Sequence, residues 1–340
     1  MKRCIVRCFF FAFAMASAVA LSMLSAQNAE AAKRQHAQTT PYGTLSTSKF
    51  DYSGGLRNGK LNGFGICRYK NGNTYYGNWS NDYKNGIGRL DHSDGRIEFG
   101  KWKNGKLTGN KGARFKVGKQ VYGIDISRHQ KRIDWDNLYF YSNKNGNVSG
   151  SATGSYMQPV LFVLMKSTEG ATLTDPTFKR NFKNAGQHGI IRGAYHFLSV
   201  NSSVDAQVKN YISHTKLEAG DFPPILDLEI SEKTMKRYHK KIVQMALQWL
   251  EKIEKHYGVR PIVYTYDNYY RTYLRGHGFD KYDFWIARFG KNKPSSRHWE
   301  IWQFTETGNV KGISGKVDIN IFRGTFSELK KYVREKGVKK

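Results

Sequence analysis

The chain has 340 residues, a formal charge of +28, an aromatic content of 14% and 34 glycines. A chain of this length can bury a hydrophobic core, and this composition excludes a disordered or low-complexity protein. The strong positive charge indicates anionic partners.

Residues 1–31 have the features of a secretory signal peptide. Three basic residues among the first seven precede an apolar stretch to about Leu24, and residues 29–31 (Ala-Glu-Ala) offer a cleavage pattern. The alternative is an uncleaved membrane anchor. We therefore expect an exported protein, periplasmic or extracellular. Export argues against nucleic acid as a partner, so anionic cell-wall polymers or a membrane surface match the charge better.

Residues 50–118, after a linker predicted at 32–49, repeat with a period of 23. Each unit predicts an aromatic-rich strand, a glycine turn and a second strand. The pattern resembles membrane occupation and recognition nexus (MORN) repeats, with Lys111 in the third copy where Gly65 and Gly88 stand earlier. The resemblance implies a lipid- or partner-binding module, and the alternative is a rigid spacer or scaffold. The recurring glycines are Gly54, Gly77 and Gly100; Gly63, Gly86 and Gly109; and Gly72, Gly95 and Gly118.

Residues 119–340 alternate apolar runs with helical stretches, which is typical of a βα architecture. Apolar residues at helical spacing predict a helix over 236–258 that ends at Gly258. The polar stretch 140–156 is expected to be a loop on one rim. The sequence thus predicts an α/β fold, an irregular (β/α) TIM-like barrel preceded by a small all-β hairpin-repeat domain. Its strands are predicted at 121–127, 160–167, 191–198, 223–230, 260–266, 283–289, 299–306 and 317–322.

Acidic residues alternate with apolar ones in three of these strands. In PPILDLEI, Asp227 and Glu229 share a face, opposite Leu226 and Leu228. A solvated edge strand would also present its acids to water, but the flanking prolines and the apolar face favour a buried strand. Asp125 and Asp318 follow the same alternation in YGIDIS and VDINIF. If the apolar faces meet surrounding helices, the four acids converge on one pocket inside the barrel.

Carboxylates this close cannot all ionise freely, so at least one pKa is expected to rise. A protonated acid beside an ionised one suits glycosidic cleavage. The rival use is a metal site; no pair of histidines has ligand spacing, and an all-carboxylate site stays open. We expect no metal and no other cofactor.

Several motifs together identify a family that this sequence resembles. These motifs are YGIDISRHQKRIDW, KSTEG followed by ATLTDPTFKRNFKNAGQHGIIRGAYHF, PPILDLEI, PIVYTY, FWIARF, IWQF and KVDINIF. Together they are similar to glycoside hydrolase family 25, over about residues 120–325. The resemblance implies an N-acetylmuramidase that cuts the β-1,4 bond after N-acetylmuramic acid in peptidoglycan, on a barrel whose last strands lack full helices. KSTEG stands where the family more often has KATEG, and the 140–156 insertion lengthens the first rim loop.

The resemblance also implies roles for individual residues. Glu229 would be the general acid. Asp227 would orient the 2-acetamido group of the substrate, with direct nucleophilic attack or an inverting route through water left open. Asp125 and Asp318 would flank this pair. Sugar-binding residues on other strands would be Glu169, Tyr195, Tyr264, Trp285 and Gln303.

Two other functions share features with this sequence. A chitinase-like hydrolase shares the D-x-E ending, but Phe222 and Ile225 occupy the first two acidic positions of its D-x-x-D-x-D-x-E signature, so that match fails. The second is a non-catalytic protein that binds the cell wall or a membrane on a lysozyme-like scaffold. Retention of all four acids argues against it.

Overall fold

The computed structural model describes residues 42–108, 114–115, 120–143, 145–154, 156–295 and 298–339. The predicted signal peptide 1–31 and three positions of the third repeat, Gly109, Lys111 and Gly118, lie outside these residues. Of the helices in the described part of the chain, none has the length and hydrophobicity of a membrane span.

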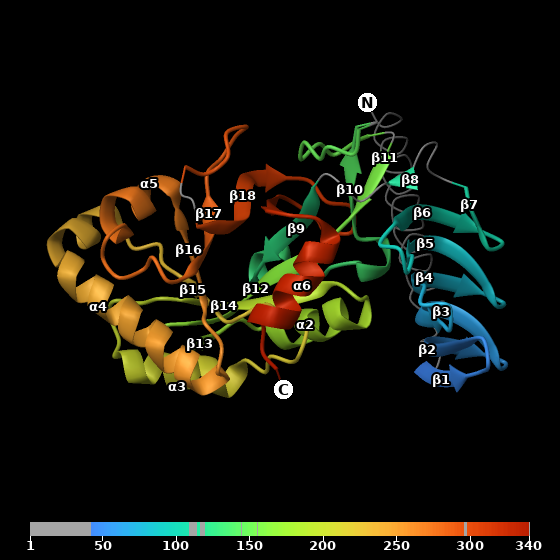
Figure 1. Cartoon of the computed structure of the whole chain (residues 1–340), viewed down its shortest axis with the longest axis horizontal. Coiled ribbons are helices and arrows are strands. Elements are labelled where there is room, and N and C mark those ends of the chain that lie inside the picture. Colours follow the sequence, from blue (N-terminus) through green and yellow to red (C-terminus); the bar gives the residue numbers. More distant parts are fainter. Residues whose placement is uncertain are drawn as a thin grey trace, which may run out of the picture. The chain divides into compact units, whose positions relative to one another are not determined.

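The repeats form an antiparallel sheet in chain order (Figure 1). β1 lies within the stretch predicted as a linker and pairs with β2. The sheet therefore begins before the predicted start of the repeats at residue 50. Its strands are β1 (Tyr42–Ser46), β2 (Phe50–Arg57), β3 (Lys60–Tyr69), β4 (Thr74–Ser80), β5 (Tyr83–Asp91), β6 (Ile97–Lys103) and β7 (Lys106–Leu107), and β8 (Arg114–Phe115) pairs with β6.

The chain then forms a nine-stranded sheet whose main strands close into a barrel, because β9 pairs with both β12 and β19. Neighbouring strands of the barrel are parallel, except that β19 runs antiparallel to β18 and β9. The predicted irregular barrel is confirmed. Its strands are β9 (Val121–Ile126), β12 (Phe162–Glu169), β14 (Ile191–Phe197), β15 (Ile225–Asp227), β16 (Ile262–Tyr266), β17 (Asp283–Ala287), β18 (Trp299–Gly308) and β19 (Val317–Phe322), with β13 (Leu173–Thr174) appended to β12.

Helices cover the outside of the barrel. The helix predicted at 236–258 is part of α4, which ends at Gly258 in the left-handed conformation (φ 70°). α3 packs against α4 (Figure 1). Within the described residues, no helix joins β17 to β18 or β18 to β19. The helices are α2 (Phe178–Gln187), α3 (Val204–His214), α4 (Glu232–Tyr257), α5 (Asp267–Tyr269) and α6 (Phe326–Lys336), with short helical turns η1 (Arg128–Gln130), η2 (Trp135–Asn137) and η3 (Tyr270–Leu274).

Each barrel strand divides its side chains between two hydrophobic clusters. Ile124, Leu226 and Ile319 pack with Trp249 of α4 in the layer between strands and helices. Residues of opposite parity, such as Ile225 and Phe162, belong to the cluster inside the barrel. This division is the alternation that the sequence predicted, and it points the acidic positions inward. The same hydrophobic cluster also includes Ile97 and Phe99 of β6.

The insertion 140–156 differs from the predicted loop. Its ends lie in β10 (Tyr139–Ser142) and β11 (Tyr156–Pro159), which pair antiparallel as a hairpin. At Gly150 the backbone carbonyl accepts hydrogen bonds from the backbone N and Nδ2 of Asn309, at 3.0 and 2.8 Å. The connection between β18 and β19 therefore holds this arm in place.

Candidate active site

The four predicted acids line one pocket of about 270 Å³. Asp125 lies near the end of β9 and Asp227 at the end of β15, and Glu229 follows two residues later. Asp318 lies at the start of β19, but this strand is antiparallel to β9, so its start pairs with Asp125. The antiparallel strand thus brings a fourth acid to the same end of the barrel as the others.

Asp125 is held by two amide side chains. Its Oδ2 accepts hydrogen bonds from Gln303 Nε2 at 2.9 Å and Asn320 Nδ2 at 2.8 Å. Tyr264 hydroxyl donates to Gln303 Oε1 at 2.8 Å, and Trp285 Nε1 donates to Asn320 Oδ1 at 2.7 Å. Because each amide oxygen receives a donor, each amide nitrogen must face Asp125.

Asp318 and Asp125 lie opposite each other and share a hydrogen bond. Burial, together with the charge of Asp125, raises the pKa of Asp318 to about 9. Burial also raises the pKa of Asp125, although donors from Asn320 and Gln303 oppose this rise. Since Oδ2 of Asp125 accepts two bonds, the natural donor of a shared proton is Asp318.

Asp227 is only 5% exposed, and its Oδ1 has no hydrogen-bond partner among the described residues. Burial, and then the neighbouring charge of Glu229, raise its pKa well above the ordinary value. A buried carboxylate oxygen without a donor is costly, so a ligand that brings a donor would be favoured here.

Glu229 is less buried than Asp227, and burial raises its pKa too. A hydrogen bond with Tyr264 opposes the rise, whereas the charge of Asp125 adds to it. Asp227 and Glu229 therefore form a coupled pair that holds protons more tightly than free carboxyls do.

Of the residues predicted to bind sugar, Tyr195, Tyr264, Trp285 and Gln303 line the pocket. Glu169 instead bonds the pocket residue Lys166, with 2.6 Å between Oε2 and Nζ.

Sequence reasoning missed other pocket residues. Lys166 lies on β12, with its Nζ 4.7 Å from the centre of the Phe197 ring, and its charge lowers the pKa of both Asp227 and Glu229. The signal was available, because Lys166 stands two residues after the inward-facing Leu164. The remaining missed lining residues are Ser127, His129, Phe197, Tyr266, Phe289 and Glu306.

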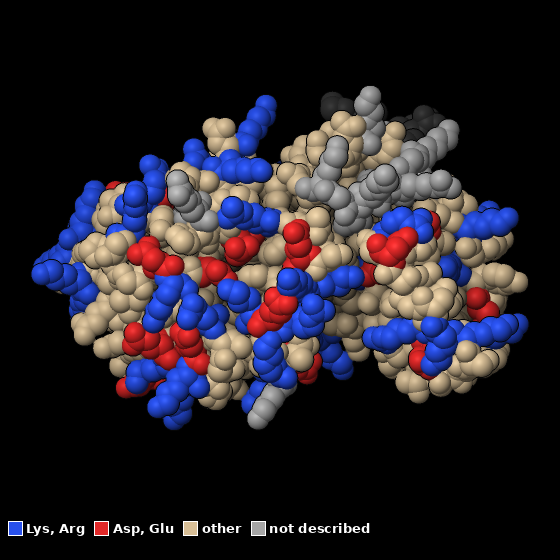
Figure 2. Space-filling model, viewed as in Figure 1, with Lys and Arg blue, Asp and Glu red and all other residues tan. Residues whose placement is uncertain are grey.

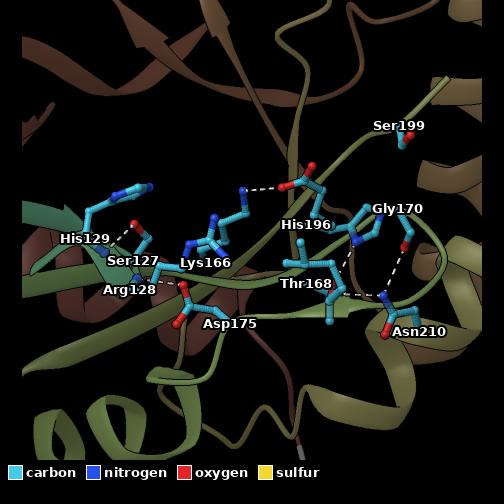
Figure 3. A network of polar contacts seen from close by, with 12 residues as sticks. Ser127, Arg128, His129, Lys166, Thr168, Gly170, Asp175, His196, Ser199 and Asn210 are labelled. Atoms are coloured by element: carbon cyan, nitrogen blue, oxygen red, sulfur yellow. Dashed lines mark hydrogen bonds and ion pairs between the residues drawn. The ribbon is translucent and has the colours of Figure 1, made fainter. Parts of the chain in front are cut away.

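A second polar network contains His196 (Figure 3). His196 bonds Thr168 through Nδ1 and Gln207 through Nε2, at 2.8 and 3.2 Å. Burial lowers the pKa of His196 to about 4, so this histidine is neutral near pH 7. The network joins β12, β14 and α3, and its role is to fix the strand ends that carry the pocket residues. In the same figure Asn210 donates to the Gly170 carbonyl at 2.9 Å.

No group of three or more His, Cys, Asp or Glu side chains among the described residues has an arrangement that could hold a metal ion. In the pocket, Asp125 is bonded by two amides and shares a hydrogen bond with Asp318.

Both parts of the chain are similar to known proteins. The model of glycosyl hydrolases family 25 matches residues 124–313, and the MORN repeat model matches residues 52–74 and 75–95. Uncharacterized protein YegX of Escherichia coli (strain K12) is 36% identical over 222 residues, which are 65% of this chain and 76% of that protein. Lysozyme M1 of Streptomyces globisporus is 30% identical over 223 residues, covering 62% of this chain and 70% of that protein. The crystal structure of the bacterial lysozyme from Streptomyces coelicolor has a TM-score of 0.54 at 28% identity and covers 64% of this chain and 99% of that chain.

A closed barrel with convergent carboxylates, together with these matches, defines the class of the protein as a glycoside hydrolase. The chain belongs to glycosyl hydrolases family 25 and carries MORN repeats before its barrel, as the sequence motifs indicated. Membership of a lysozyme family supports a peptidoglycan hydrolase activity.

Proposed function

We propose that this enzyme is an N-acetylmuramidase that hydrolyses the β-1,4 bond between N-acetylmuramic acid and N-acetylglucosamine. The observation that carries the proposal is the pair of Asp227 and Glu229 in one pocket. Both have raised pKa values, and one buried oxygen of Asp227 lacks a donor among the described residues. The pair provides a proton donor and an acceptor aimed at the same substrate.

Glu229 is the general acid of the proposed reaction. Its raised pKa keeps a larger fraction of the carboxyl protonated towards neutral pH than in a free glutamic acid. It donates this proton to the glycosidic oxygen as the bond to the anomeric carbon breaks. The leaving sugar therefore departs as a neutral alcohol.

Asp227 positions the 2-acetamido group of N-acetylmuramic acid. Its unpartnered Oδ1 accepts the amide N–H of the substrate, which turns the acetamido carbonyl oxygen towards the anomeric carbon. Attack by that oxygen forms a cyclic oxazolinium ion. Water then opens the ring while Glu229, now a carboxylate, takes the proton, so the configuration is retained.

The remaining pocket residues support this pair. Asp125 and Asp318 hold a proton and fix the amides of Gln303 and Asn320. Tyr195 and Trp285 line the pocket but are only 8% and 1% exposed, so Phe289, which is 44% exposed, offers the aromatic surface for a pyranose ring. The proposed substrate lies outside the cytoplasmic membrane, which agrees with the export expected from residues 1–31. The basic charge would hold the enzyme near anionic wall polymers or a membrane surface.

The test compares wild type with Glu229→Gln on purified peptidoglycan. We expect the wild type to generate new reducing ends that are muramic acid after borohydride reduction and mass spectrometry. Glu229→Gln should lower kcat by about 10³-fold. A matched control is Glu306→Gln, which neutralises another glutamate of the same pocket and should leave most of the activity.

Other results would contradict the proposal in distinct ways. Reduced glucosamine ends would show that the other bond is cut. Saccharide binding without new reducing ends, from a folded protein tested on several wall types, would indicate a non-catalytic wall-binding protein. If Glu229→Gln and Glu306→Gln lowered kcat equally, Glu229 would not be the general acid.

A further inference from the structure

One sector of the pocket rim is strongly basic. The connections that follow β15, β16 and β17 begin with residues 231–241, 267–275 and 288–295, here called the basic rim. Because these strands are parallel neighbours, their carboxyl ends and the connections that follow lie side by side next to the pocket. Figure 2 shows lysines and arginines gathered over the end of the barrel that carries α4 and α5.

Most of these cations have no structural partner. Lys236 pairs with Glu232 at 3.3 Å. By contrast, seven exposed cations of the rim have no ion pair with any residue that the structure describes. They are Lys233, Arg237, Lys240 and Lys241 on α4, Arg275 after β16, and Lys291 and Lys293 after β17.

Lys233 on α4 does not stabilise the helix. It lies in the first turn, where the helix dipole is positive and cations are unfavourable. Tyr238 on the same helix is 45% exposed and has a non-helical backbone (φ −125°, ψ 25°). An exposed aromatic ring among cations at a pocket rim is a surface suited to binding.

The connection after β17 is fixed beside the pocket. Asp267, at the start of α5, accepts hydrogen bonds from Ser295 N and Oγ at 3.0 and 2.9 Å and from Arg288 Nη1 at 3.3 Å. Phe289 lines the pocket and lies 6.2 Å from the Tyr266 ring. Lys291 follows Phe289 by two residues, so its position next to the pocket is set by this clamp.

We propose that the basic rim binds the carboxylates of the peptide stems carried by the N-acetylmuramic acid residues of the glycan in the pocket. This inference rests on the proposed function, and it adds that the enzyme prefers stem-bearing glycan to naked glycan. The sugars are neutral and the pocket itself is acidic, so the cations have no use within the sugar subsites. Each stem begins at the lactyl group of a muramic acid and leaves the pocket over its rim, where charge complementarity favours an acidic peptide.

The test uses uncross-linked glycan strands bearing pentapeptides and the same strands stripped of peptides by an amidase. For the full-length wild type at about 0.01 M salt, we expect a KM about five-fold lower for stem-bearing strands, because the Debye length is then about 30 Å. At about 0.15 M salt this difference should shrink. The triple variant Lys233→Gln, Arg237→Gln, Lys291→Gln should lose the preference while its kcat on stripped strands stays unchanged.

A matched control is Lys330→Gln, Lys331→Gln, Arg334→Gln on α6, which removes the same charge from exposed positions that follow β19. It should keep the preference. Equal KM values of the wild type for both strands would overturn the inference while leaving the hydrolase activity intact, whereas failure to cut either strand would contradict the proposed function itself. Equal KM values combined with rim-dependent binding of polyglycerol phosphate would assign the rim to phosphate polymers instead.

Discussion

The amide groups around Asp125 set the proton arrangement of the whole pocket. Gln303 and Asn320 both turn their nitrogens to the same carboxylate oxygen, because Tyr264 and Trp285 occupy their carbonyl oxygens. Asp125 must then accept on that oxygen, and the proton of the Asp125–Asp318 pair belongs on Asp318. The Tyr264 hydroxyl has one proton, which it donates to Gln303 in this structure, and it also lies close enough to Glu229 to lower the pKa of that carboxyl.

Tyr264→Phe should move the alkaline limb of the pH–rate profile. Tyr264 lowers the pKa of Glu229 when its hydroxyl turns its proton from Gln303 to the Glu229 carboxylate, so loss of the hydroxyl raises that pKa further. The general acid then stays protonated to higher pH, and the alkaline limb of kcat/KM shifts upward while the maximum rate falls because Gln303 loses its donor. The measurement is kcat/KM on soluble glycan strands across pH.

Tyr282→Phe is the control for this change. Tyr282 is 1% exposed, and its hydroxyl has no hydrogen-bond partner among the described residues. The pH dependence of kcat/KM of the Tyr282→Phe variant should therefore coincide with that of the wild type. An unshifted or downward-shifted limb in Tyr264→Phe would refute the role of this hydroxyl.

At the scale of elements, a row of glycines explains the period of the repeat sheet. Gly54, Gly65, Gly77, Gly88 and Gly100 are successive cross-strand partners from β2 to β6. A Cβ on Gly65 or Gly88 would lie within 2.2 Å of a tyrosine hydroxyl, because the ring of Tyr52 or Tyr75 crosses the row there. These tyrosines interleave with tryptophans in edge-to-face pairs, such as Tyr75 with Trp79 and Trp102 at 5.1 and 5.4 Å. The row is therefore a packing requirement of the aromatic layer.

Gly77→Ala should destabilise the repeat sheet. The added methyl would meet Gly88 Cα at 2.5 Å and Ile87 O at 2.8 Å, and backbone atoms cannot rotate away. We expect a loss of about 2–3 kcal/mol in the free energy of unfolding, measured by urea denaturation.

Gly105→Ala provides the comparison. It has a positive φ of 80°, but the nearest atom to its Cβ is 3.8 Å away. Only the backbone strain remains, so its loss should be about 1 kcal/mol. If Gly77→Ala proved no more damaging than Gly105→Ala, the steric explanation of the glycine row would fail.

At the scale of the whole molecule, the acidic pocket makes stability depend on pH. Asp125, Asp227, Glu229 and Asp318 all have raised pKa values, so the folded protein binds more protons than the unfolded chain. Stability is then highest below the ordinary carboxyl pKa and falls as pH rises. For Asp318 this fall extends from about 3.8 to about 9. The acidic pocket that the proposed reaction needs thus lowers the stability of the folded protein at alkaline pH.

Asp318→Asn should flatten this dependence. The amide can still donate to Asp125 but does not ionise, so the variant gains stability relative to the wild type as pH rises from 4 towards 9. The measurement is Tm of both proteins at several pH values, with circular dichroism to confirm the same fold. If Tm of the wild type and of Asp318→Asn changed with pH in the same way, the raised pKa of Asp318 would be contradicted.

The sequence by itself determined the alternation of acids and apolar residues, the repeat period and the family motifs, because these depend only on local periodicity and on residue types at fixed spacing. The end of α4 at Gly258 was predictable for the same reason. The hairpin at the ends of 140–156 was not predicted, because the polar residues between its strands indicate a loop, although the aromatic residues of β10 (YFYS) are typical of a strand.

Only the tertiary structure decided which residues meet. Asp125 and Asn320 are 195 positions apart in the chain, yet barrel closure places them 2.8 Å apart. The same closure leaves Oδ1 of Asp227 without a donor among the described residues and aligns three separate connections into one basic rim. Strand alternation fixes the direction of a side chain, but the distance between strands remote in sequence is set by how the sheet curves and closes.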